Sequence, residues 1–213
     1  MKNTESNYKL ARLCHGYATL MGEITRRYEV IQSMIYGGRF TGAHITRCEI
    51  VGLNFRKIAE LIIFANLIGH EEVYASLYPT YQSEWRLSQI IKRIKVINPN
   101  YYPKAVIYTE GTLPNGEQGI IVDNSPEGQW LSEDELVGMY NDCGDLLHAR
   151  NPFQDAVDLD EFDAKFQMWS PKIEALLAQH QVALVDGVHQ ISCILSPPGS
   201  HEHSVEILQL REV

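Results

Sequence analysis

The sequence has few cysteines, and their spacing predicts neither a disulfide framework nor a zinc cluster. This chain of 213 residues has four, none in a CxxC pair: Cys14, Cys48, Cys143 and Cys193. Scattered thiols of this kind favour a reduced, cytoplasmic protein. The apolar run at 61–68 is far shorter than the roughly 18–20 residues of a membrane span. The opening residues, MKNTESNYK, lack the apolar segment of a secretory signal, so we expect a cytoplasmic protein with no membrane partner.

Common catalytic motifs are missing as well. The sequence contains no GxSxG, no P-loop and no GxGxxG, so serine hydrolase and nucleotide-binding functions lose their usual support. We expect no cofactor and predict no metal ligands. Hydrophobic residues make up 45% and charged residues 21% of the chain, which indicates a globular protein of one domain or one domain with a small appendage.

Negative charge is concentrated in the middle of the chain. Residues 1–104 carry 14 basic and 8 acidic side chains, whereas residues 105–170 carry 2 basic and 14 acidic ones. The basic half could face RNA, and the acidic 105–170 region could bind a partner protein. The alternative is that the basic and the acidic regions only reflect solvated helix faces.

Apolar periodicity predicts mostly helices. Apolar residues recur every three or four positions over 8–35 and 43–68, and Gly37-Gly38 separates these two long antiparallel helices. Further helices are expected over 82–97, from Ser132 to about 148–150, and over 158–180, with a short one near 71–77. Ser132 and Glu135 form a capping-box pattern, and Asp158 with Glu161 repeats it.

Two segments predict β-structure. A hairpin is expected near 104–124, around a Pro-Asn-Gly turn, and three short strands are expected over 182–186, 189–195 and 204–210. The predicted fold class is therefore mainly α: a bundle of about five helices with an inserted β-hairpin and a small C-terminal antiparallel β-meander. The predicted domains are a helical unit at 1–180 and the strands of 181–213, packed on it or appended to it.

One helix carries a string that resembles a known family. Residues 140–153 read YNDCGDLLHARNPF, residues 47–60 read RCEIVGLNFRKIAE, and residues 98–103 read NPNYYP. Together with the two long N-terminal helices, these segments resemble the HEPN superfamily, helical domains common in prokaryotic toxin, phage-defence and RNA-processing systems. The resemblance covers about residues 8–180 and implies a homodimer. Active members are metal-independent endoribonucleases that use an arginine and a histidine separated by four to six intervening residues.

The arginine of that motif is absent before the histidine of the string. Counting back from His148, the three allowed positions hold Asn141, Asp142 and Cys143. The one arginine and histidine with the required spacing are Arg39 and His44, and chance alone would give about as many. A neutral imidazole can accept the proton of a 2′-hydroxyl while a guanidinium neutralises charge on the phosphate. We therefore expect the catalytic residues to be His148, Arg150 and Arg56.

Other residues are expected to support this site or to bind RNA. Positive charge and aromatic rings alternate in a pattern that favours single-stranded RNA, at Lys92, Arg93, Lys95, Tyr101, Tyr102 and Lys104. A supporting layer around the catalytic residues is expected from Glu49, Glu60 and Asn151. The structural alternative for Glu49 and Glu60 is an ion-pair ladder along one helix. For the RNA-binding set it is a solvated helix face followed by packed tyrosines.

These features predict an RNA-binding or RNA-cleaving HEPN-like protein of a bacterial stress or phage-defence system. The alternative is a catalytically inactive interaction module of the same fold, which binds a partner protein. A third possibility, a metal-dependent hydrolase, would use the acidic run at 155–163 or the pair His201 and His203.

Overall fold

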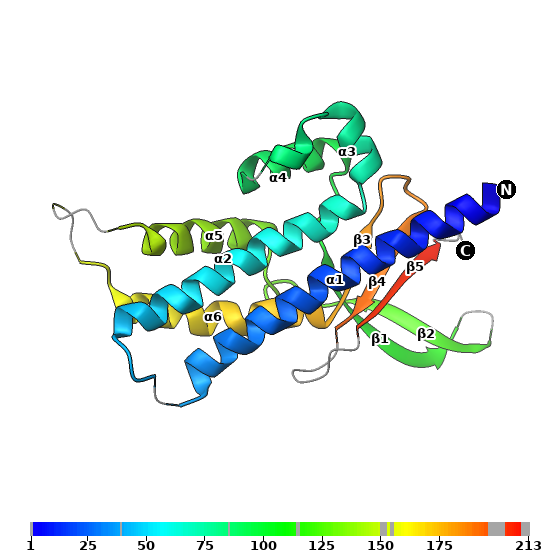
Figure 1. Ribbon diagram of the computed structural model, residues 1–213. Coiled ribbons are helices and arrows are strands. Elements are labelled where there is room, and N and C mark those ends of the chain that lie inside the picture. The colour runs from blue at the N-terminus through cyan, green and yellow to red at the C-terminus, as the bar shows by residue number, and fades with distance from the viewer. Residues whose placement is uncertain are drawn as a thin grey trace.

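The described residues form six α-helices and five β-strands (Figure 1). The computed structural model describes residues 2–38, 40–84, 86–113, 116–149, 153, 156–195 and 203–209. The helices are α1 (Lys2–Tyr36), α2 (His44–Ile68), α3 (Glu71–Leu77), α4 (Leu87–Ile97), α5 (Glu133–Leu147) and α6 (Leu159–Ala178), with a single 3-10 turn at Tyr81–Ser83. The strands are β1 (Lys104–Thr112), β2 (Gln118–Asn124), β3 (Gln179–Ala183), β4 (His189–Ile194) and β5 (Ser204–Gln209).

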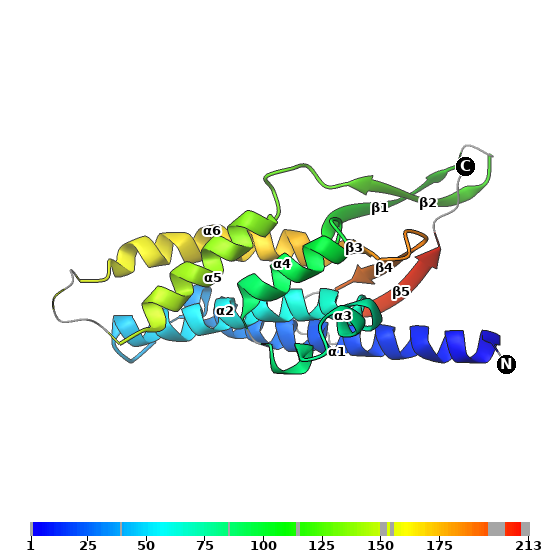
Figure 2. The ribbon, with the colours of Figure 1, turned by 90° about the horizontal axis from the view of Figure 1, so that it is seen from above.

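The two long N-terminal helices are present and lie side by side, as Figure 2 shows from above. Gly38 adopts a positive φ of 108° in the connection between them, a conformation that glycine reaches without steric cost. Among the described residues, no helix combines the length and apolar character needed to cross a membrane.

The strands form one sheet, and this corrects the predicted fold class. The order is β2-β1-β3-β4-β5, all antiparallel. The hairpin joins the C-terminal strands because Lys104 pairs with Gln181 and Ala105 with His180. The prediction of a mainly α bundle with a separate hairpin and a small meander is therefore wrong, and the fold is an α+β mixture with a substantial sheet. Turn chemistry showed each hairpin, but the β1–β3 pairing joins segments that are far apart in sequence.

Local signals place the last two helices. Ser132 caps α5: its hydroxyl accepts from the Glu135 backbone N–H, and the Glu135 carboxylate accepts from the Ser132 N–H, which confirms the predicted capping box. Asp158 caps α6 by accepting from two backbone N–H groups, at Asp160 and Glu161.

The core surrounds α2. Helices α1, α5 and α6 all pack against α2. A helix surrounded in this way needs apolar residues around most of its circumference, and α2 has them. The Phe55 ring stacks on that of Phe166, with centroids 5.5 Å apart, and meets Trp169 edge-on. This aromatic cluster holds the first half of α6 against α2, and so it brings the side chains at the start of α6 close to those at the start of α2.

Candidate functional site

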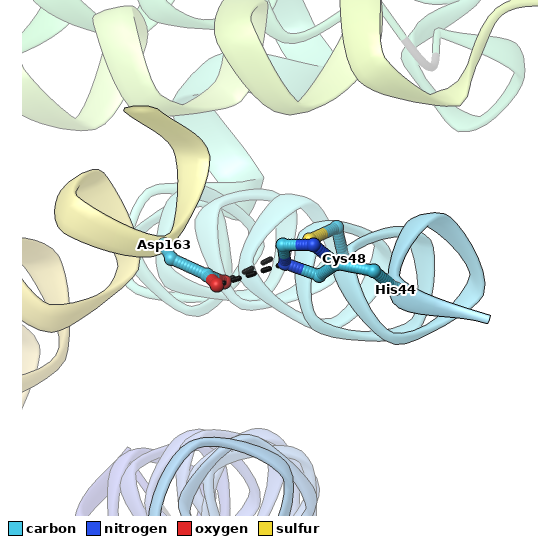
Figure 3. A group of neighbouring side chains, drawn as sticks. All are labelled: His44, Cys48 and Asp163. Atoms are coloured by element: carbon cyan, nitrogen blue, oxygen red, sulfur yellow. Dashed lines mark hydrogen bonds and ion pairs between the residues drawn. The ribbon is translucent and has the colours of Figure 1, made fainter. Parts of the chain in front are cut away.

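A polar cluster lies where α2 begins and faces the start of α6 (Figure 3). His44 is the first residue of α2, and Cys48 follows one turn later, so both side chains lie on one face of the helix. Asp163 lies on α6, in the turn that follows its capped N-terminus. Arg47, beside Cys48 on α2, completes the cluster.

Each oxygen of the Asp163 carboxylate has a partner on α2. Its Oδ2 accepts from Arg47 Nη2 and lies 2.9 Å from His44 Nε2. Its Oδ1 lies 3.7 Å from Cys48 Sγ. Three side chains of α2 therefore converge on one carboxylate of α6, which neutralises its charge and fixes its position.

The contact with Asp163 favours one tautomer of His44. Arg47 Nη2 also lies 3.0 Å from His44 Nε2, but this nitrogen cannot accept from Arg47 while it donates to Asp163. Because a carboxylate oxygen only accepts, Nε2 carries the proton and donates to Asp163. The lone pair of the neutral ring is then on Nδ1, which leaves that nitrogen as the basic atom.

Burial differs across the cluster. Cys48 is fully buried, the Arg47 and Asp163 side chains are mostly buried, and His44 is exposed. Burial, reinforced by the negative charge of Asp163, raises the pKa of the Cys48 thiol to about 11. The thiol is therefore protonated at neutral pH and serves as a weak donor to the carboxylate.

A cavity of about 470 Å³ adjoins the cluster. Its lining comes from the end of α1, the connection to α2 and the facing ends of α2 and α6: Met34, Ile35, Gly38, Phe40, Gly42, His44, Arg47, Asp163, Phe166 and Gln167. At the start of α2, the N-cap residue is Ala43, no side chain of the described residues caps the helix, and its first turn has no acidic residue. The partial positive charge of this helix end is thus available to an anion in the cavity.

The predicted catalytic residues lie elsewhere. His148 is the exposed C-cap of α5, while Arg150 and Asn151 lie outside the described residues. Arg56 is half-buried between α2 and α5, where its guanidinium stacks 3.9 Å from the Tyr140 ring centroid and donates to the Tyr140 hydroxyl at 2.6 Å. A Cβ at Gly144 would lie 2.4 Å from Arg56 Nη1, so the glycine makes room for this arginine. Arg56 thus serves as a bridge between the two helices.

The residues expected to support that site are partly brought together. Glu60 contacts Arg56, with Oε1 3.7 Å from Nε, and accepts from Lys57 at 2.7 Å. Glu49 is exposed and lies two turns before Arg56 on α2. Arg56 and Glu60 therefore form one half of the expected ion-pair ladder, whereas the half that would join Glu49 to Arg56 stays a prediction.

The expected RNA-binding residues do not form one open surface. Tyr101 is 0% exposed, and Tyr102 donates its hydroxyl to the Leu131 carbonyl, so neither ring is presented for base stacking. Arg93 is paired with Glu84 and Lys95 with Glu133, whereas Lys92 and Lys104 are exposed. Positive charge on this side of α4 is therefore partly neutralised within the protein.

The cluster of His44, Arg47, Cys48 and Asp163 was not predicted from the sequence as a unit. One local signal was available: a histidine and a cysteine four residues apart, one residue after the start of a predicted helix. Asp163 carried none, because it is 119 residues from His44 and sits in an acidic run that looked like solvated helix surface.

Comparison with known proteins adds no family to this description. No family model matches the sequence, and neither the curated proteins nor the solved structures contain a significant match to the chain.

Proposed function

We propose that the protein binds RNA in the cavity at the start of α2 and cleaves it without a metal ion, as part of a bacterial stress or phage-defence system. One observation carries the proposal: an imidazole oriented by a carboxylate, His44 with Asp163, lines the same cavity as Arg47, next to an uncapped helix N-terminus. A base, a guanidinium and a partial positive charge then surround one space, which suits a phosphodiester.

The chemistry follows from the tautomer of His44. Nδ1 accepts the proton of a 2′-hydroxyl, the 2′-oxygen bonds to phosphorus, and the bond to the 5′-oxygen breaks. That oxygen takes a proton from water, and the hydroxide left behind removes the proton from Nδ1. Arg47 has five N–H donors, more than Asp163 uses, and so it can also contact the phosphate as charge develops. Asp163 stabilises the imidazolium that forms.

The proposed site includes the one histidine with the HEPN spacing, a match that chance alone would also give and that adds no weight of its own. Arg39 and His44 have the spacing of the family's arginine and histidine, and the segment between them includes Phe40 and Gly42 of the cavity lining. Arg39 itself lies outside the described residues. The homodimer that the resemblance implies is part of the proposal.

The test is RNA cleavage in EDTA by the wild type, His44→Ala and His148→Ala. We expect His44→Ala to lower the rate about 100-fold or more, since general-base catalysis contributes about 10²–10⁴-fold. The matched variant His148→Ala, another exposed histidine next to a helix end, should cleave like the wild type. If only His148→Ala loses RNA cleavage, the site lies at the end of α5 and not at His44. If the folded wild type does not cleave RNA, the enzymatic function is refuted.

A second candidate, a protein-interaction module, is favoured by the β1–β2 hairpin. Four large apolar side chains are exposed on it: Ile107, Ile120, Ile121 and Val122. The hairpin projects from the helices, and β2 is an edge strand of the described sheet (Figures 1 and 2). Exposed apolar edge strands are typical docking surfaces, and this one lies in the acidic 105–170 region.

If the hairpin docks a partner, a photo-crosslinking amino acid at Ile120 should capture one protein reproducibly in cells. The same group at Val96, an equally apolar exposed position on α4, provides the control and should give no specific product. Equal labelling from both positions would mean that exposure alone explains the crosslinks.

A further inference from the structure

We propose that His44, Cys48 and Asp163 bind a zinc ion, and that the ion inhibits the RNA cleavage proposed above. The regulatory part rests on that proposed function, whereas the metal site rests on the structure of the cluster alone.

The three donor atoms are already close to a zinc-binding arrangement. One ligand atom from each residue lies within 4.8 Å of the other two. The ligand atoms of a tetrahedral zinc ion lie about 3.3–3.6 Å apart, given bond lengths of about 2.0–2.3 Å. His44 Nε2 lies 2.9 Å from Asp163 Oδ2, and Cys48 Sγ lies 3.7 Å from the other oxygen of that carboxylate, Oδ1. Side-chain rotations within the 4.8 Å cluster would have to bring one Asp163 oxygen, the imidazole nitrogen and the sulfur to this spacing.

The donor types select the metal. Imidazole nitrogen, thiolate sulfur and carboxylate oxygen together suit zinc, whereas magnesium and calcium prefer oxygen ligands alone. Cys48 is the buried member of the cluster, whereas His44 and Asp163 line the cavity. An ion can therefore reach the site from the cavity, and a water molecule there can complete its coordination.

Arg47 competes with the ion. Its guanidinium donates to the Asp163 oxygen that also faces His44, and so it supplies the positive charge that zinc would bring. Two cations so close repel each other, so Arg47 must turn away from Asp163 when the ion binds. Arg47→Met, which keeps much of the side-chain length without the charge, should tighten zinc binding.

Zinc removes the base that cleavage requires. The ion takes the lone pair of His44 Nε2, and a neutral imidazole then carries its single proton on Nδ1. Nδ1 can no longer accept the proton of a 2′-hydroxyl. Asp163 is also drawn from the imidazole to the metal, so both partners of the proposed base are engaged by the ion.

The binding test is calorimetric titration of the metal-free full-length protein with Zn²⁺, together with the absorption spectrum of its Co²⁺ form. We expect one ion per chain and a thiolate-to-cobalt band in the near ultraviolet. Cys48→Ser should lose the band. Cys48→Ser and Asp163→Asn should each weaken zinc binding about 100-fold or more, because even the loss of a residue that only supports a ligand lowers metal affinity about 10- to 100-fold. Cys14→Ser, which alters a thiol on α1, is the control, and circular dichroism checks that each variant folds.

A wild type without the band, or a folded Cys48→Ser that retains it, would overturn the metal site. In the cleavage arm, one equivalent of Zn²⁺ should inhibit the wild type, and EDTA should restore its activity. Cleavage that continues with zinc bound would overturn the inhibition. Zinc binding by a protein that cleaves nothing in EDTA would refute the proposed function and leave the metal site established.

Discussion

Phe55→Ala is expected to lower the free energy of unfolding by about 3–5 kcal/mol, the usual cost of removing a buried aromatic ring. The Phe55 ring is 0% exposed and lies in the middle of α2, between the rings of Phe166 and Trp169 on α6. Alanine would lose both aromatic contacts and leave a cavity that two helices, held by many other contacts, cannot close.

Urea denaturation followed by circular dichroism measures this loss, and Leu53→Ala is the matched control. Leu53 lies two residues earlier on the same helix but is 44% exposed, so its truncation should cost much less, about 1 kcal/mol or below. Similar costs for the two variants would contradict the central position of α2 and the α2–α6 packing that places Asp163 beside His44.

Acidification is the second large effect, and it depends on His180. This residue is fully buried at the start of β3, where its Nδ1–H donates to the Leu177 carbonyl at 3.0 Å and its Nε2 accepts from the Tyr17 hydroxyl at 2.7 Å. Both hydrogen bonds suit the neutral ring. Burial penalises the charged form and lowers the pKa of His180 to about 4.

The direction of the pH effect follows from linkage. The unfolded chain has a histidine pKa of about 6.5 and takes up a proton below that pH, whereas the folded protein does so only near pH 4. The stabilisation is therefore fully present above pH 6.5 and is lost as the pH falls towards 4, by about 3 kcal/mol. Burial also lowers the pKa of His70, so this second histidine acts in the same direction.

Free energies of unfolding from urea denaturation at pH 7, 6, 5 and 4 test this prediction. The wild type should lose about 3 kcal/mol over the series, most of it between pH 6 and pH 4. His180→Gln, which can still accept from Tyr17, should show a shallower dependence, while exposed His15→Gln should match the wild type. A His180→Gln variant as acid-sensitive as the wild type would mean that other groups cause the loss.

Much of the secondary structure could be predicted because its signals are local. The Ser132–Glu135 capping box and the Asp158 cap act within three residues, and the glycines at 37 and 38 end α1 where the sequence indicated. One end was misplaced: His180 was expected in the last helix, but it pairs with β1 as part of β3. The partner strand is distant in sequence, so no local pattern showed that the helix would stop at Ala178.

The candidate site was less predictable because it depends on packing. Tyrosine is amphipathic, so its position in a basic segment could not show that Tyr101 is enclosed in the core while Lys92 remains exposed. For Arg56, the sequence correctly indicated Glu60 as a neighbour on the same helix face, but Tyr140 comes from another helix.

The sequence by itself determined where most helices begin and end, where the chain turns, and that the middle of the chain is acidic. Tertiary structure alone decided that the hairpin and the C-terminal strands form one sheet, and that His44 and Cys48 meet Asp163. Caps, turns and periodicity arise from interactions within about four residues, so they can be identified from sequence. Sheet pairing and the convergence of α2 and α6 depend on burying apolar surface from distant segments, as Phe55 and Phe166 do, and that free energy exists only once the chain has folded.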